Sequence, residues 1–337
     1  MTAKGFGRRL ELVEELNALA LAAQKAHESL RCATESTGTC ADETQSRSVV
    51  DIGILTIRDD EFREVLAAFP DGDEVWELSR HYNIRVADAG GGLSYRVAIV
   101  RQGEQGNGEA LDAARDMIEE VRPNLLLVVG IAGGLPHDEF TLGDVVLSTR
   151  VNDYCVEARK EGETPSYSLS GGPIARALSA AVVNLPAREA ALGNWAEGLP
   201  SRPELVWTDR LYGPKEWQDA VRDSLTYHSG QKRPPVFTSG VIASSDRLVK
   251  DPELLFPWVQ TARHLLAVEM ESGGAYRAAR DRVPMLSIRG ISDIIGLKRD
   301  RTWTAFACKS AAMFARAFLR TTPVPPRGAA RVNSVII

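Results

Sequence analysis

The runs Val268–Ala275 (VEMESGGA) and Val283–Asp293 (VPMLSIRGISD) decide the fold that this chain can adopt. The first run places a carboxylate at the mouth of a helix made of small residues. The second is a short apolar run, typical of a buried strand, that ends in Ile-Ser-Asp. Ligands of α/β sheets bind beyond the carboxyl ends of the strands, so the runs predict two carboxylates at neighbouring element ends. Glu271 could hold a diol there, and Asp293 could donate a proton.

Apolar runs and amphipathic stretches alternate around this pair and predict an α/β layered sheet with helices on both faces. The predicted strands are 49–56, 80–88, 95–101, 125–129, 145–147, 236–242 and 285–290, and the predicted helices are 60–69, 109–121, 173–184, 217–225 and 302–320. The proline-punctuated stretch 160–235 is predicted to be an insertion-prone region over the site.

Composition divides the chain into three parts. A 3.6-residue apolar period predicts one helix over 8–31, and the stretch 32–48, rich in Ser, Thr, Gly and Asp, is typical of a linker. Residues 1–48 are therefore expected to lie outside the core domain, which spans 49–320. The N-terminal helix could pack on the core or on a sister subunit, or it could dock on a separate partner protein. The tail 321–337 carries Pro and Arg and is predicted to be mobile.

Charge and cysteine content exclude several classes of partner. The 337 residues carry a net charge of −5 with a sequence pI near 5.7, which gives no electrostatic basis for binding nucleic acid or an anionic membrane surface. We find no run of about 18 or more apolar residues, so we expect no transmembrane helix. The four cysteines form no CxxC pair and have no histidine at metal-ligand spacing. We therefore expect a reduced, cytoplasmic protein without a metal site.

The glycine-rich run Gly130–Gly134 (GIAGG) follows a five-residue apolar strand. Its glycines would let backbone N–H groups approach a ligand, and Ala132 and Gly133 are our candidates for that contact. The run is neither GxGxxG nor GxxxxGK, so it supports neither a dinucleotide fingerprint nor a P-loop. No Ser-His-Asp order with a nucleophile elbow is visible either.

These motifs and their order resemble the nucleoside phosphorylase/nucleosidase superfamily, most closely the 5′-methylthioadenosine/S-adenosylhomocysteine nucleosidases. An opening strand that leads to Glu61, the glycine run at 130, the SGV loop at 239, VEME at 268 and ISD at 291 occur in the order of that family. The resemblance implies a three-layer phosphorylase-like fold with a mixed central sheet and helices on both faces. It also implies a homo-oligomer that uses no cofactor.

The resemblance implies a role for each carboxylate. In the family, the aspartate of ISD, here Asp293, donates to the purine N7. The second glutamate of VEME, here Glu271, holds the ribose hydroxyls, and Met270 packs beneath the sugar. The glutamate after the opening strand, here Glu61, orients the attacking water, with Asp60 as the alternative if the register is off by one.

The remaining substrate contacts follow from the same comparison. Ala243 and Ser244 fall where the family stacks on and hydrogen-bonds the base, and Trp303 falls where an aromatic residue lines the 5′ pocket. Lys298, Arg299 and Arg301 precede this tryptophan. They could be a solvated surface, or Lys298 and Arg301 could hold phosphates at the 5′ end of the substrate.

Two departures from the family favour water over phosphate as the nucleophile. Ile131 replaces a serine of the phosphate-using relatives, and Val128 stands where purine phosphorylases place an arginine. An apolar side chain cannot hold an oxyanion. The sequence therefore predicts a purine nucleoside or nucleotide N-glycosidase. Details such as GIAGG and RGISD resemble the branch of the superfamily attached to bacterial signalling and defence proteins. A phosphorylase and a non-catalytic nucleotide sensor remain as alternatives.

Overall fold

The computed structural model describes residues 49–158, 166–205, 211–247, 249, 252–262 and 264–327. The predicted helix over 8–31 and the linker 32–48 lie outside these ranges, as do residues 328–337 of the predicted tail. The chain forms two compact units, Met1–Val49 and Val50–Ile337, and every described helix and strand belongs to the second. No helix within the described ranges is both long and apolar enough to cross a bilayer.

Ten strands of the described part of the chain form one mixed sheet. The strands are β1 (Ile52–Thr56), β2 (Glu74–Glu77), β3 (His81–Gly90), β4 (Leu93–Arg101), β5 (Leu125–Gly134), β6 (Val145–Ala158), β7 (Ser166–Pro173), β8 (Phe237–Ser244), β9 (Leu265–Glu269) and β10 (Met285–Ile294). Pairing runs from β5 to β10, β6, β8 and β9 and back to β5, so these five strands close a ring. β1, β4, β3 and β2 extend from β5 as an open wing, and β7 pairs with β6.

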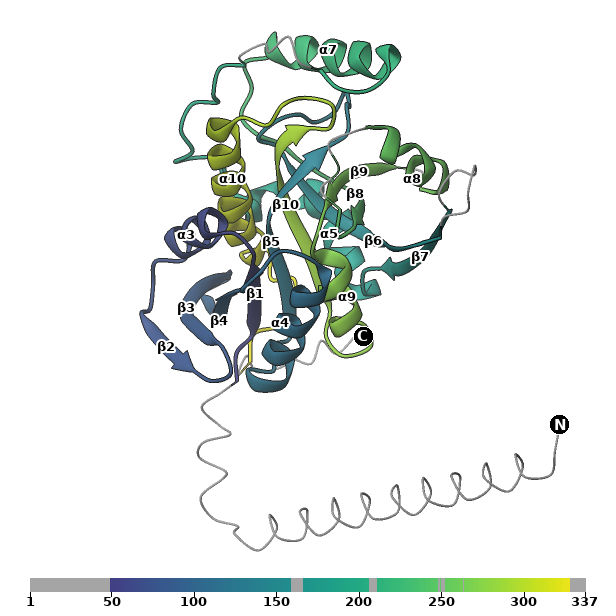
Figure 1. The fold of residues 1–337 in the computed structure, drawn as a ribbon. Coiled ribbons are helices and arrows are strands. Elements are labelled where there is room, and N and C mark those ends of the chain that lie inside the picture. The colour runs from purple at the N-terminus through teal and green to yellow at the C-terminus, as the bar shows by residue number, and fades with distance from the viewer. Residues whose placement is uncertain are drawn as a thin grey trace, which may run out of the picture. The chain divides into compact units, whose positions relative to one another are not determined.

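Helices cover both faces of the sheet (Figure 1). They are α3 (Asp59–Ala68), α4 (Asn107–Glu120), α5 (Arg176–Val183), α6 (Glu189–Leu192), α7 (Lys215–Ser229), α8 (Phe256–Thr261), α9 (Ser272–Ala279) and α10 (Arg301–Leu319), with short 3₁₀ turns at Leu185–Arg188 and Pro252–Leu254.

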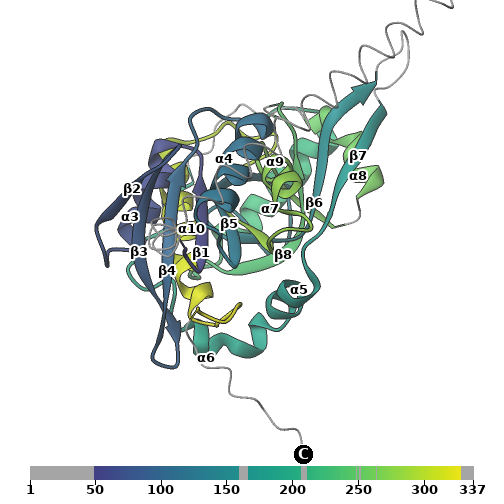
Figure 2. The same ribbon diagram turned by 90° about the horizontal axis from the view of Figure 1, so that it is seen from below.

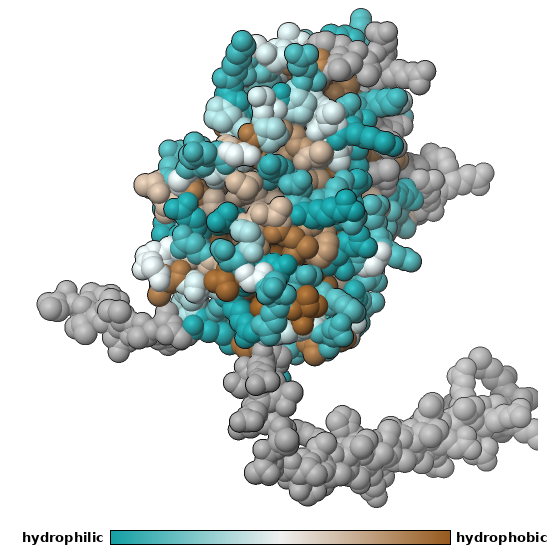
Figure 3. Space-filling view, turned by 90° about the vertical axis from the view of Figure 1, so that its left-hand side faces the viewer, coloured by the Kyte–Doolittle hydropathy of each residue, from teal (hydrophilic) through white to brown (hydrophobic). Residues whose placement is uncertain are grey.

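Alternate residues of β5 explain the three layers, because successive side chains of a strand point to opposite faces. Leu125, Leu127 and Val129 pack in the apolar cluster that includes α3 and α10, whereas Leu126 and Val128 pack in the cluster of α4 and α9. The predicted α/β fold, with a mixed sheet and helices on both faces, is confirmed. The surface in Figure 3 is mainly hydrophilic with small apolar groups, as expected when the apolar residues fill these internal clusters.

Two sequence predictions of element ends differ from the structure. The run Gly130–Gly134 is not a loop, because β5 continues through it and pairs residue by residue with β10. β10 likewise continues through Asp293, with a register shift between Ile291 and Asp293. Such a bulge re-aims a side chain next to a functional site. Strands β2, β7 and β9 and helix α8 were not predicted, because each is short or irregular in its apolar pattern.

The described residues at the start of the predicted tail form hydrogen bonds with the core domain. Thr322 Oγ1 donates to the Ala89 carbonyl (2.5 Å), and the Tyr95 hydroxyl donates to the Val324 carbonyl. The N–H of Arg327 donates to Asp51 Oδ1 (2.5 Å). The core domain therefore extends at least to Arg327.

The proline-punctuated region is tied to the ring by a buried carboxylate. Asp144, at the start of β6, has no exposed surface and forms ion pairs with both Arg202 and Arg233. α7 adds Val221 and Leu225 to the apolar cluster around the ring. These contacts hold the described parts of 166–235 against the domain.

α4 and α9 lie side by side (Figure 2) because the first turn of α9 contains two glycines, Gly273 and Gly274. The N–H of Gly274 donates to Asn107 Oδ1 (2.6 Å), and a Cβ built at Gly274 would lie 1.9 Å from the Asn107 carbonyl oxygen. The contact is backbone against backbone, so no side-chain rotation can relieve it.

Replacing Gly274 by Ala should therefore destabilise the protein by about 1–3 kcal/mol or more, the usual cost of overpacking. The matched control is Gly108→Ala, because Gly108 also lies in α4 but a Cβ there meets nothing within 4 Å. That control should stabilise by about 0.5–1 kcal/mol, since alanine loses less conformational entropy than glycine in a helix. Urea denaturation measures both, and equal midpoints for the two variants would contradict the close contact.

Candidate active site

Glu61 is held by the backbone at the start of α3. Its Oε2 accepts hydrogen bonds from the N–H groups of Ile57 (3.1 Å) and Arg58 (2.8 Å), and its Oε1 accepts one from Ile131 (2.8 Å). A carboxylate offers about four acceptor sites, so one site on Oε1 is left for a ligand. Burial raises the pKa of Glu61, and the charge of Arg289 and these N–H donors oppose that shift.

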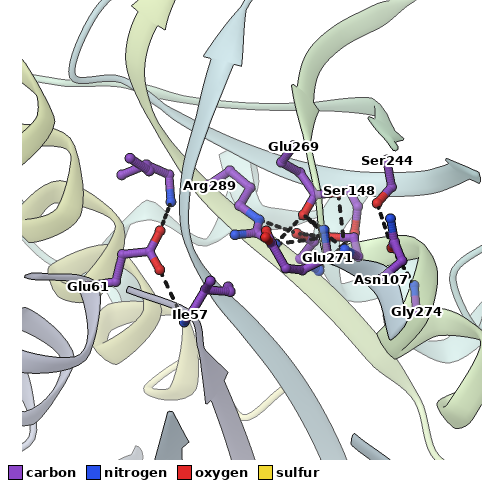
Figure 4. Close-up of polar contacts among 12 residues, drawn as sticks. Ile57, Glu61, Asn107, Ser148, Ser244, Glu269, Glu271, Gly274 and Arg289 are labelled. Carbon is purple, nitrogen blue, oxygen red and sulfur yellow. Dashed lines mark hydrogen bonds and ion pairs between the residues drawn. The ribbon is translucent and has the colours of Figure 1, made fainter. Parts of the chain in front are cut away.

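Arg289 lies between Glu61 and a second pair of carboxylates (Figure 4). Its side chain has no exposed surface. It forms an ion pair with Glu269, donates to Ser287 Oγ (3.0 Å) and Ser272 Oγ (3.2 Å), and comes within 3.8 Å of Glu271. Arg289 Nη1 has no acceptor among the described residues.

The two glutamates of VEME have different surroundings. Glu269 accepts hydrogen bonds from the N–H groups of Glu271 and Ser272 and from Ser272 Oγ, so it fixes the start of α9. Within the described part of the chain, the Glu271 carboxylate accepts a hydrogen bond only from the Gly106 N–H, and this bond is long (3.3 Å). Burial and the charge of Glu269 raise the pKa of Glu271, and Arg289 opposes the shift. Glu271 therefore keeps free acceptor positions for a ligand.

Gly130 is the point at which Glu61 and Arg289 approach each other. A Cβ built on this residue would lie 2.5 Å from Glu61 Oε1 and 2.7 Å from Arg289 Nη1. The free acceptor site of Glu61 and the free donor of Arg289 thus lie against the same glycine. A water molecule there could accept from one and donate to the other.

Asp293 lies at the bulge of β10. Its Oδ1 accepts hydrogen bonds from Ser292 Oγ (2.6 Å) and from Arg299 Nε (2.8 Å). Its side chain is 12% exposed. Both bonds from the described residues go to Oδ1, which leaves Oδ2 to a ligand.

One cavity, called here the main cavity, brings the predicted site together. Six of the predicted residues line it: Glu61, Ala132, Gly133, Met270, Glu271 and Asp293. They come from four different stretches of the chain and meet because β1, β5, β9 and β10 end at the same edge of the sheet. Ile57, Arg58, Gln105, Ile131, Arg247, Val249, Val268, Glu269 and Arg299 complete its lining.

A second cavity, called here the side cavity, adjoins the main one, because Asp293 and Arg299 line both. Trp303 and Lys298 line it, together with Leu142, Leu205, Ser292, Leu297 and Asp300. The predicted residues near the 5′ group thus gather here, with one exception. Arg301 lines neither cavity, because it is the exposed first residue of α10.

The predicted base-binding residues Ala243 and Ser244 lie outside the main cavity. Both are fully buried in β8, which is paired on both edges, and neither lines the main cavity. The Ser244 hydroxyl donates to Asn107 Oδ1 (2.9 Å). Arg247 and Val249, beyond the end of that strand, line the main cavity instead. The rule that ligands bind beyond strand ends pointed to these later residues.

Sequence reasoning also missed Arg289 and Glu269 and did not separate Arg299 from its neighbours. A signal for Arg289 was present, because an arginine inside the apolar run MLSIRGIS demands a buried partner. No comparable signal singled out Arg299 among three nearby cations.

Comparison with known proteins agrees with this geometry. The family model described as the phosphorylase superfamily matches residues 51–321. The ATP nucleosidase Cap17 of Escherichia coli (strain KTE188) is 25% identical over 217 residues, which cover 64% of this chain and 39% of that protein. The death domain-containing ATP nucleosidase of Amphimedon queenslandica is 24% identical over 229 residues, which cover 63% and 37%. The chain thus spans less than two fifths of these curated relatives.

Solved structures share the fold. The futalosine hydrolase of Helicobacter pylori strain 26695 superimposes with a TM-score of 0.55 at 18% identity, covering 80% of this chain and 97% of that chain. The 5′-methylthioadenosine/S-adenosylhomocysteine nucleosidase of Helicobacter pylori gives a TM-score of 0.55 at 17% identity, with the same coverage. Since the family model matches residues 51–321, most of the sequence, this chain belongs to the phosphorylase superfamily.

Proposed function

We propose that this protein hydrolyses the N-glycosidic bond between a purine and a ribose. The observation that carries the proposal is the convergence of Glu61, Glu271 and Asp293 on the main cavity. The reaction needs an acid for the leaving base, a hold on the ribose and a nucleophile on the opposite face of the sugar. Each carboxylate matches one need.

Glu271 is the proposed hold on the ribose. Its free acceptor positions suit a cis-diol, which presents two neighbouring O–H donors. Met270 lines the same cavity and supplies an apolar surface for the sugar ring. The backbone of Ala132 and Gly133 can approach the ligand closely because neither residue carries a large side chain.

Asp293 and Glu61 divide the proton transfers. As the C1′–N9 bond breaks, its electron pair goes to the purine, and Asp293 delivers a proton to N7. A water held between Glu61 Oε1 and Arg289 Nη1 bonds to C1′ and gives a proton to Glu61. The products are a free base and a ribose with a 1-hydroxyl. The raised pKa of Glu61 suits a base that must take up this proton.

Hydrolysis is favoured over the phosphorylase alternative. Val128 is fully buried in the apolar cluster of α4 and α9, and the N–H of Ile131 is already bonded to Glu61. Neither position offers a donor to phosphate. The sensor alternative would not require three carboxylates around one cavity.

A 5′-phosphorylated purine is the proposed substrate. Two relatives carry the name ATP nucleosidase, and Lys298 lines the side cavity beside Trp303. The cytoplasmic location, the homo-oligomer, a partner of the N-terminal helix and a role in bacterial signalling or defence stay predictions from the sequence.

The single experiment that tests the proposal incubates the protein with adenosine, methylthioadenosine, AMP and ATP and measures free base by chromatography. Release of base from at least one of them supports the proposal. Binding without release would favour the sensor.

Asp293→Asn should abolish base release, because an amide cannot deliver a proton. We expect a loss of at least about 10²-fold in kcat, while nucleoside affinity changes by less than about tenfold. A suitable control is Asp112→Asn, an exposed residue of α4 that pairs with Arg115. Turnover at the normal rate by Asp293→Asn would remove this residue from the mechanism.

Glu271→Gln should raise KM for ribonucleosides, because an amide has half the acceptor capacity of a carboxylate. In the unmodified protein, 2′-deoxyribonucleosides should be turned over at least about tenfold less efficiently, which corresponds to the loss of one hydrogen bond to a charged group. Steady-state kinetics on both sugars gives the answer. Equal kcat/KM values would show that no carboxylate holds the diol.

Added inorganic phosphate should not raise the rate of base release. The reason is the absence of a donor at Val128 and Ile131 to hold the anion. The sugar product is to be identified by phosphorus NMR with and without phosphate. A ribose 1-phosphate signal in that spectrum would contradict hydrolysis and support the phosphorylase alternative.

A further inference from the structure

Arg299 differs from the other arginines of the main cavity in its partner. Arg58 forms a two-pronged pair with Asp60 (2.8 and 2.6 Å), and Arg247 pairs with Glu157. Arg299 alone of these three bonds the proposed acid, through Nε to Asp293 Oδ1 (2.8 Å). Its two Nη groups donate to no acceptor among the described residues, and its side chain is 35% exposed.

The side cavity behind this pair is rich in unused donors. Trp303 is only 7% exposed, and its buried indole Nε1–H has no acceptor in the described part of the chain. Lys298 lines the same cavity. Asp300 is the one other acid of the lining, and it is engaged in capping α10 through the N–H groups of Thr302 and Trp303. An anion would satisfy these donors.

Nucleotide geometry connects the two cavities. In the anti conformation of a purine nucleotide, the C8–N7 edge of the base lies on the same side as C5′. If Asp293 contacts N7, the 5′ phosphates therefore leave the ribose toward the residues beside Asp293. Arg299 lies there and lines both cavities.

We infer that Arg299 is a specificity-determining residue that exchanges the carboxylate of Asp293 for a 5′ phosphate of the substrate. In the free protein Arg299 occupies Oδ1 of the acid. A bound 5′-phosphorylated purine offers the guanidinium the charge of its phosphate, so Arg299 turns to the phosphate. Asp293, which is then no longer paired, takes up a proton from solvent and can deliver it to the base. A half-exposed ion pair is weak enough for such a competition. A nucleoside lacks the phosphate and meets an acid that is still paired.

This inference rests on the proposed function, but it makes separate predictions for nucleotides and nucleosides. Arg299→Ala should lower kcat/KM for ATP and AMP by about tenfold or more, the effect of losing one charge-assisted contact. For adenosine, kcat/KM should rise, because Asp293 is no longer paired. The matched control is Arg301→Ala, since Arg301 is a nearby exposed arginine that lines neither cavity.

Equal losses for ATP and adenosine in Arg299→Ala would mean that Arg299 only supports the structure, and the inference would be wrong. It would also be wrong if nucleotide turnover were unchanged. If the unmodified protein releases no base from any substrate, the proposed function fails, and calorimetric binding then decides the role of Arg299.

The binding experiment tests the exchange directly. Asp293→Asn removes the competing carboxylate, so it should bind ATP about two- to fivefold more tightly than the unmodified protein, the range set by a half-exposed ion pair. Adenosine affinity should show no such gain, and adding Arg299→Ala to this variant should remove the gain for ATP. Weaker or unchanged ATP binding by Asp293→Asn would show that the two residues do not compete.

Discussion

Arg289 carries a charge that has no exposed surface, and its partners outside β10 come from the start of α9 and the end of β9. Its own strand, β10, pairs with β5 and β6 but not with β9. The ion pair with Glu269 therefore reaches past β5, opposite Gly130, where a side chain would block it. Removing one member of such a pair typically costs about 3–5 kcal/mol, because the other charge stays buried. The start of α9, and with it the backbone of Glu271 in the main cavity, depends on this bridge.

The Arg289–Glu269 ion pair also explains why Glu269 and Glu271 differ in function. The carboxylate oxygens of Glu269 bind Arg289, Ser272 and the N–H of Glu271, so Glu269 fixes the backbone at the start of α9. Glu271 is held at its Cα by that backbone, yet its carboxylate has few partners. Environment, rather than residue type, thus assigns one acid to the structure and one to the ligand. The same logic separates the acid and base of other carboxylate pairs.

The sequence allowed the layers and the neighbouring positions of Glu271 and Asp293 to be predicted, because apolar periods and strand-end rules act locally. The mixed sheet and the place of Glu61 were implied by the resemblance to the superfamily. It did not reveal that Gly130–Gly134 pairs with β10, because that pairing joins segments about 160 positions apart in sequence. The contact of Ser244 is also long-range, since its hydroxyl donates to Asn107 of α4, and no local pattern predicts it. The pairing of Arg299 with Asp293 depends on how one loop folds back on itself, which no periodic pattern specifies.

The contact between Arg327 and the start of β1 has a consequence for how such a domain can be combined with other segments. Arg327 bonds the Val50 carbonyl (3.1 Å) as well as Asp51, so the chain enters and leaves the described domain at one place. That place is the amino end of β1, whereas Ile57 and Glu61 reach the main cavity just beyond its carboxyl end. A unit whose two ends meet away from its cavity can be joined to, or inserted into, another polypeptide without rerouting its strands. The domain that carries the proposed active site can therefore be combined with different neighbouring domains.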